Sequence, residues 1–199
     1  ISTLLLLSIY TISDEVNDPF EEFNRKTFEF NENVDEIILK PVAKFYSNFP
    51  PKIKNGVTNF FNNLEDVETS INQLLQGKPK KSINDISRFI INSTIGLAGF
   101  IDVASKIGLE RHEEDFGQTL AVWGVSSGPY IVLPGLGPST MRDTLGMIPD
   151  NLLNPFWFIE HIPTKNSISA MNLIDTRARY LGLESVVIGD EYLFYKDAY

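Results

Sequence analysis

The sequence predicts a single, mainly α-helical domain with little β structure. Over much of the first hundred residues, apolar residues recur at three- and four-residue spacing, as they do on one face of a helix. Only one short run, Tyr130 to Leu133, has the composition of a strand. The 199 residues contain no internal repeat, low-complexity tract or long linker. A chain of this length is able to bury one substantial core.

The first helix is expected to begin at Asp18, which supplies a capping carboxylate. Pro19 suits the first helical position, and Glu21 stands where a capping box places an acid. Apolar positions then follow at helical spacing, from Phe20 through Val34. Pro41 is expected to interrupt this helix because proline lacks an amide hydrogen and clashes with the preceding turn. Pro50-Pro51 ends the segment.

Two more apolar stripes follow, over residues 53–75 and 83–91. Gly77 and Pro79 mark the end of the first stripe, and Gly96 marks the end of the second. Taken singly, each stripe is expected to face a protein core. Taken together, several short Phe-rich amphipathic helices suit a bilayer interface equally well, because lipid and protein interiors select the same residues.

Glycines punctuate the next stretch, between Gly96 and Gly137. The short strand at 130–133 lies within it. Pro138-Ser139-Thr140 is expected to open a helix that reaches Met147. Apolar residues at helical spacing predict a late helix over residues 168–181.

Charge and composition exclude several classes of function. There are 17 Lys and Arg against 26 Asp and Glu, a net charge of −9, so nucleic acid is not an expected partner. Any contact with a membrane should therefore be apolar. The chain has no Cys, which excludes disulfides and thiolate chemistry, and two His residues are too few for a His-rich metal site. No metal or cofactor is expected.

Residues 1–12 form an apolar segment, too short to span a bilayer, for which about 20 residues are needed. It is typical of the apolar part of a signal peptide, which predicts that residues 1–13 are a signal-peptide remnant cleaved before Asp14. The mature, exported domain would then cover residues 14–199. The alternative is a buried N-terminal helix or strand.

The segment Gly124 to Gly128 matches the nucleophile-elbow pattern G-x-S-x-G around Ser126. Asp143 or Asp150, and then His161, follow in the order of a hydrolase triad. An elbow requires a strand before the serine and a helix directly after it, and neither is predicted here. The pattern is therefore interpreted as a turn, and the chain is not expected to be an enzyme. A secreted lipid hydrolase that uses Ser126 is kept as an alternative.

Five segments carry a resemblance to the MlaA/VacJ family of outer-membrane phospholipid-transport lipoproteins. In order along the chain, they are NDPFEEFNRKTFEFN (17–31), NQLLQGKP (72–79), RFIINSTIGLAGFIDVA (88–104), EEDFGQTLAVWGVSSGPYIVLPGLGPSTMRDTLG (113–146) and, more weakly, DEYLFYKDAY (190–199). Such long, ordered matches are more specific than any short motif above.

The resemblance implies a ring-shaped domain of short amphipathic helices around a central channel, on the periplasmic face of the outer membrane. Its implied function is to remove mislocalised phospholipid from the outer leaflet, pass it to a soluble periplasmic carrier and so maintain lipid asymmetry. An outer-membrane porin trimer is the implied partner. A scaffold or surface antigen that binds porin without transporting lipid is the third hypothesis.

The resemblance implies an acylated Cys directly after the signal peptide. This chain contains no Cys. Either the sequence is altered or trimmed there, or this member is held in the membrane without acyl chains. The missing residue leaves lipidation open without changing the expectation of transport.

Polar residues within apolar helices are the candidates for the lipid path. Asn24, Arg25 and Asn31 are expected to face the channel or to bond neighbouring backbone, with helix-packing hydrogen bonds as the alternative. Arg88 and Arg142 are candidates for contact with a phosphate headgroup, with ion pairs between helices as the alternative. A second set is expected to form a hinge or gate. Gly96 and Gly99 belong to it, unless they only permit close packing.

Overall fold

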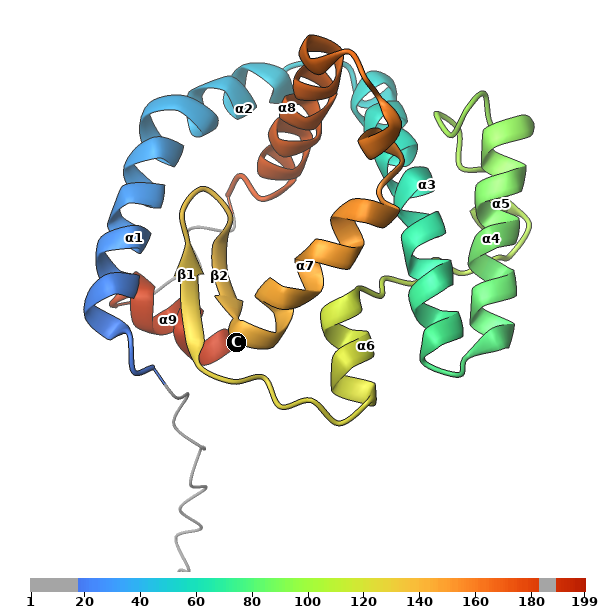
Figure 1. Cartoon of the computed structure of the whole chain (residues 1–199). Helices are drawn as coiled ribbons and strands as arrows, with labels where there is room; N and C mark the ends of the chain where they lie inside the picture. The colour runs from blue at the N-terminus through green and yellow to red at the C-terminus, as the bar shows by residue number, and fades with distance from the viewer. Residues whose placement is uncertain (1–17, 183–188) are drawn as a thin grey trace, which may run out of the picture.

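In this computed structural model, which describes residues 18–182 and 189–199, the helices follow the outline of a ring (Figure 1). A two-stranded hairpin lies inside this outline, next to the first helix. The prediction of a mainly α-helical fold with little β structure is confirmed. The expected signal-peptide remnant, residues 1–13, lies outside the described residues.

The blue arc of Figure 1 is one continuous helical rod made of α1 (Glu21–Val34), the π-helical η1 (Asp35–Leu39) and α2 (Lys40–Ser47). The expected break at Pro41 is wrong. The amide of Lys40 bonds to the carbonyl of Asp35, five residues back, so the turn before the proline is widened. A π-helical turn of this kind accommodates a proline that an α-helical turn would reject.

The expected cap at Asp18 is also wrong. Helix α1 begins two residues later, after Phe20, without a side-chain cap. The Asp18 carboxylate instead accepts hydrogen bonds from Asn24 Nδ2, at 2.7 Å, and from the Tyr192 hydroxyl. A residue with the sequence signature of a local cap is used here for a contact between distant segments.

Helices α3 (Pro51–Leu75) and α4 (Pro79–Thr94) form a long antiparallel pair at one side of the ring (Figure 1). The predicted end at Gly77 is confirmed, because this residue has a φ of 74°, which favours glycine. The short α5 (Val103–Lys106) packs beside α4.

The short α6 (Phe116–Val122) precedes the hairpin of β1 (Tyr130–Leu133) and β2 (Gly137–Thr140). The antiparallel register places Tyr130 opposite Thr140. The expected helix through Met147 is present, but its expected opening at residues 138–140 is wrong, since these residues form β2. Helix α7 (Met141–Leu153) begins directly after it, with the Thr140 side chain accepting from the Asp143 amide.

The chain ends with a 3-10 turn, η2 (Pro155–Phe158), and the helices α8 (Ile162–Arg179) and α9 (Glu191–Ala198). The predicted late helix is confirmed, although it begins six residues earlier than its apolar pattern indicated. His161 caps this start by accepting from the Thr164 amide. Helix α9 was not predicted from the sequence.

Candidate functional site

The interior between α3 and α4 is polar. Ten buried residues of these two helices carry polar or charged side chains: Asn63, Asp66, Thr69, Ser70, Asn72, Gln73, Ser82, Asp85, Arg88 and Asn92. Burying such groups is costly unless they find partners. Most of these side chains have one, but within the described residues the Gln73 amide has no hydrogen-bond partner.

Arg88 of α4 is at the centre of this interior and is 1% exposed. Its Nη1 donates to the Leu109 carbonyl at 2.6 Å and to Ser105 Oγ at 3.0 Å. Its Nη2 faces Asp102 at 3.3 Å, and its Nε lies 3.3 Å from Asp66 of α3. The guanidinium thereby joins α3 and α4 to the loop around α5. This geometry corresponds to the ion-pair alternative, and contact with a headgroup stays a prediction.

Asp102 is held ionised by its neighbours. Its burial acts to raise the pKa, but hydrogen bonds from Ser105 and Asn92, together with the charge of Arg88, lower the pKa of Asp102 to about 2. The Asn92 Oδ1 also accepts from the Val103 amide at 2.8 Å. The loop after α4 is therefore fixed by charge and by hydrogen bonds.

A pair of acidic side chains joins α3 to α7. Asp150 accepts from Asn72 Nδ2 at 3.3 Å and from the Phe116 amide at 3.0 Å. Burial, and then the charge of Asp150, raises the pKa of Glu68 to about 8. At neutral pH Glu68 is therefore protonated and hydrogen-bonded to the Asp150 carboxylate.

Asn24 and Asn31 lie seven residues apart on α1 and both bond the backbone around β1. Asn24 Nδ2 donates to the Tyr130 carbonyl at 3.1 Å, and its Oδ1 accepts from the Val132 amide at 2.9 Å. Asn31 repeats this pattern with the Leu133 carbonyl and with the amide two residues later. These amides take the place of a neighbouring strand, which is the backbone-bonding option left open by the sequence. Contact with a channel stays a prediction.

The two remaining arginine candidates have different surroundings. Arg25 pairs with Glu21 at 2.8 Å and Asp190 at 2.9 Å, and lies 4.3 Å from the Tyr192 ring centre. It therefore ties α1 to α9. The Nε of Arg142 pairs with its neighbour Asp143 at 2.9 Å. Lipid contact stays a prediction for both arginines.

Gly96 and Gly99 lie in the compact turn after α4. A Cβ at Gly96 would come within 2.2 Å of the Ile101 carbonyl oxygen. Gly99 has a φ of 92°, and a Cβ there would lie 2.7 Å from Asn63 Nδ2. Close packing requires a glycine at both positions. The proposed hinge or gate is a separate property and stays a prediction.

The exterior is apolar, in contrast to the interior. Among the described residues, many large apolar side chains are exposed on the helices of the ring: Phe23, Phe30, Ile37, Phe45, Ile53, Ile83, Ile90, Leu145, Ile148, Leu152, Ile162 and Leu173. For α1 and α4, the expectation of core-facing stripes is therefore wrong, and the bilayer-facing alternative fits. In the described part of the chain, no helix combines the length and apolar character of a membrane span.

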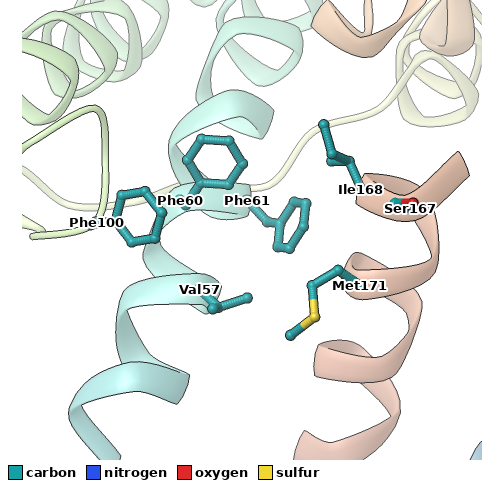
Figure 2. Close-up of a pocket in the computed structure, with 7 residues that line it drawn as sticks. All are labelled: Val57, Phe60, Phe61, Phe100, Ser167, Ile168 and Met171. Carbon is teal, nitrogen blue, oxygen red and sulfur yellow. The ribbon is translucent and has the colours of Figure 1, made fainter. Parts of the chain in front are cut away.

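Between α3 and α8 lies an apolar cavity of about 250 Å³. In Figure 2, Val57 and Phe61 of α3 point across it toward Met171 of α8. Phe60 stacks on Phe100 of the glycine-containing turn, with 5.2 Å between ring centres. The cavity is therefore bordered by the segment that carries the hinge candidates.

A second, polar cavity of about 400 Å³ lies between α2, α3 and α8. Its lining includes two cations, Lys54 and Arg179, and the buried carboxylate of Asp175. The Asp175 carboxylate accepts from the hydroxyls of Tyr46, at 2.8 Å, and Thr58, at 2.9 Å. The two cavities thus share α3 and α8 but differ in polarity.

Sequence analysis did not single out Lys54, Thr58, Asp175 or Arg179. A signal for the last two existed in the sequence Asp-Thr-Arg-Ala-Arg, which gathers three charges at the end of the predicted late helix. Nothing in the sequence showed that this turn lies next to Lys54. Proximity between residues more than a hundred positions apart depends on the fold.

Ser126 lies exposed in the loop between α6 and β1, so a helix precedes it and a strand follows. This is the reverse of a nucleophile elbow. His161 bonds Thr164 at the start of α8, and Asp143 bonds Arg142 and Thr140. The three residues form no relay with one another. Within residues 18–182 and 189–199, no group of three or more acidic or His side chains is arranged to hold a metal ion.

Comparison with known proteins assigns the family. The family model of the MlaA lipoprotein matches residues 16–199. A Rickettsia typhi protein is 42% identical over 165 residues, covering 82% of this chain and 66% of the relative, so the match spans slightly less than two thirds of that protein. The intermembrane phospholipid transport system lipoprotein MlaA of Haemophilus influenzae is 38% identical over 93% of this chain and 77% of its own length. Its Escherichia coli counterpart is 36% identical over 92% and 75%.

A solved structure agrees with these matches. It is described as the structural basis for maintenance of bacterial outer membrane lipid asymmetry. The two chains superpose with a TM-score of 0.81 at 36% identity, over 92% of this chain and 95% of the other. Matching sequence and matching fold over nearly the whole described chain lead to one conclusion. The chain belongs to the MlaA lipoprotein family.

Proposed function

We propose that this chain is a phospholipid transport component on the periplasmic face of the outer membrane. It removes mislocalised phospholipid from the outer leaflet through an amphipathic channel, passes it to a soluble periplasmic carrier and maintains lipid asymmetry. An outer-membrane porin trimer is its membrane partner. The names of the Haemophilus influenzae and Escherichia coli relatives support phospholipid transport.

The observation that carries this proposal is the inverted polarity of the ring. Apolar side chains such as Ile83 and Ile90 are exposed on α4, while Asp85 and Arg88 of the same helix are buried. Lipid tails offer no partner for a polar group, so polar residues at membrane depth face each other or a water-filled path. A helix pair that is apolar on its outer faces and polar between its helices suits embedding in one leaflet.

Two measurements test this proposal. The full chain, reconstituted with a porin trimer in vesicles with labelled phospholipid, should transfer that lipid to the carrier. Transfer no faster than from vesicles with porin alone would contradict transport. Porin binding without transfer would instead favour the scaffold hypothesis.

The second measurement concerns attachment. Salt and carbonate washes should leave the chain in the membrane fraction, because apolar burial is not screened by ions. Detergent should extract it. Complete release by salt would contradict apolar embedding.

The hydrolase alternative is not favoured, because Ser126 lies in the reversed structural context. Purified protein should release no fatty acid from phospholipid vesicles. Release that disappears in Ser126→Ala would reinstate this alternative.

A further inference from the structure

We propose that the chain holds one phospholipid molecule between α3 and α8. Its phosphate lies beside Lys54 and Arg179, and one acyl chain lies against Phe61 and Met171. The inference rests on the proposed function and adds to it a site made of named residues.

One face of α8 carries the change from apolar to charged. Ile168 and Met171 line the apolar cavity, while Asp175 and Arg179 line the polar one. These positions recur every three or four residues, so they share a helix face. At 1.5 Å per residue, the distance along α8 from Ile168 to Arg179 is about 16 Å. This is close to half the bilayer's hydrocarbon thickness of about 30 Å, and so to one acyl chain.

On α3 the two linings lie side by side on neighbouring faces of the same turns. Lys54 and Thr58 line the polar cavity, and Val57 and Phe61 line the apolar one. The Thr58 hydroxyl donates to Asp175 at 2.9 Å, which joins the two helices where the lining changes. The two cavities therefore lie on either side of this contact, the apolar one toward the Ile168 end of α8 and the polar one toward its Arg179 end.

The charge of the polar cavity suits a phosphate. Asp175 is already engaged by the Tyr46 and Thr58 hydroxyls, and Arg179 lies 3.6 Å from it. Lys54 Nζ donates once, to the Ser47 carbonyl at 2.6 Å, and an ammonium group has three donors. Two cations thus face one carboxylate, which leaves a local excess of one positive charge in a chain whose net charge is −9.

A free phosphate offers the same anionic chemistry as a lipid headgroup. The apolar cavity favours a phospholipid over a free phosphate as the occupant. Its lining of Val57, Phe61, Ile168 and Met171 offers no group that would bind an ion. An acyl chain gains free energy by filling such a space. The occupant is therefore expected to carry a phosphate and a hydrocarbon tail together.

Photocrosslinking of the full chain in dodecyl maltoside micelles tests this assignment. The probe is a phospholipid with a diazirine at the end of one acyl chain. A diacylglycerol with the same labelled chain tests the need for the phosphate. The phospholipid probe in a large excess of inorganic phosphate tests the need for the tail.

The phospholipid probe should label peptides that contain Phe61 or Met171. Labelling by the diacylglycerol should be about tenfold weaker, since charge-assisted hydrogen bonds are lost. Inorganic phosphate should not compete. Equal labelling by both lipids, or displacement by phosphate alone, would overturn the proposal.

Two substitutions separate the ends of the site. Lys54→Gln should reduce labelling about fivefold or more, for the same loss of a charged donor. Lys52→Gln, an exposed lysine of α3 outside the cavity lining, should leave it unchanged. Met171→Trp fills the apolar cavity and should abolish labelling. Leu173→Trp, exposed on α8, is its control.

The outcomes distinguish this site from the proposed function. A Met171→Trp protein that labels like wild type overturns the site and leaves transport standing. Loss of labelling with wild-type transfer, in the presence of the Leu173→Trp control, supports the site and shows that it lies off the transfer path. Labelling at Phe61 and Met171 in a wild-type protein that transfers nothing supports the site and contradicts transport. Parallel loss of labelling and transfer, with unchanged Leu173→Trp controls, supports both.

Discussion

The hairpin side of the ring and the α3–α4 side are packed in opposite ways. Around β1, the described interior is apolar and aromatic, with Tyr130, Val132 and Tyr192 buried and Phe28 packed against them. Between α3 and α4 the interior is charged and centred on Arg88. One short chain thus stabilises one region by apolar burial and the other by ion pairs and hydrogen bonds.

This difference shows what each region faces. The hairpin lies inside the ring outline (Figure 1), where its apolar side chains are covered by α1 and α9. Helices α3 and α4 expose apolar residues such as Leu74 and Ile83 on the outside and keep their polar residues within. For the α3–α4 side, the lipid of the proposed membrane environment would complete the packing.

The largest expected effect on the free energy of unfolding comes from replacing Arg88, at the centre of the charged interior between α3 and α4. Arg88→Met leaves the buried carboxylate of Asp66 and the Leu109 carbonyl without this partner. Loss of one member of a buried ion pair costs about 3–5 kcal/mol. The free energy of unfolding in detergent should fall by this amount.

Arg25→Met, which removes exposed ion pairs with Glu21 and Asp190, is the matched control and should lower the free energy of unfolding far less, because solvent screens exposed pairs. Equal effects of the two substitutions would show that the α3–α4 interior is not held by its buried charges.

The sequence predicted α1, α3 and α4, but neither α9 nor the direction in which the apolar faces of the helices point. The stripe of Ile83 and Ile90 has the spacing of a helix face in either environment, because spacing reports which residues share a face and not what covers it. Arg88 was recognised as unusual within such a stripe. Its partners at Asp66 and Asp102 lie on other elements, and sequence pattern alone does not give that arrangement.

The candidate site was predicted less completely than the fold. Asn24 and Asn31 were recognised because an amide on a Phe-rich helix needs a partner, and their bonds to β1 supply one. Lys54 and Arg179 are ordinary surface residues in the sequence. They become a candidate site only because α3 and α8 run antiparallel beside the same cavity.

The second effect concerns the backbone of the hairpin. Asn24→Leu removes the partners of the Tyr130 carbonyl and the Val132 amide, two buried backbone groups. At about 1–3 kcal/mol for each unsatisfied group, partly offset by apolar burial, the loss should be about 3 kcal/mol. Asn33→Leu is the control, since Asn33 is exposed and bonds only within α1. Thermal unfolding in detergent measures both, and a tolerated Asn24→Leu would contradict the edge-bonding role.

The third effect separates packing from motion in the turn after α4. Gly99→Ala places a Cβ at a φ of 92° and close to Asn63, so a destabilisation of about 2 kcal/mol is expected. If the turn also acts as a gate, transfer per folded molecule should fall as well. Normal transfer by the folded fraction would leave Gly99 as a packing residue only.

The fourth effect is a dependence on pH at the acidic pair. The pKa of Glu68 is about 8 in the folded chain and about 4.3 in an unfolded one. Between these values the folded state binds more protons, so its stability should decrease as pH rises from 5 to 9. Glu68→Gln cannot ionise and should remove this part of the decrease. Glu22→Gln, exposed on α1, is the control, and parallel pH profiles for all three proteins would contradict the shared proton.

The smallest expected effect on folding gives the sharpest test of the comparison. Ile83 and Ile90 of α4 are exposed, so the double substitution Ile83→Ser, Ile90→Ser should change the free energy of unfolding in aqueous buffer or low detergent by about 0.5 kcal/mol or less. Val132→Ser in the buried hairpin core should cost several times more, because it removes apolar contacts and buries a hydroxyl.

Partitioning into phospholipid vesicles, measured by flotation, should show the reverse order. The double variant loses apolar area that would contact lipid and should bind vesicles less, while the folded Val132→Ser protein should bind as wild type does. If the double variant unfolds readily and still binds vesicles fully, the α4 stripe is part of a protein interface, and the inverted-ring interpretation fails.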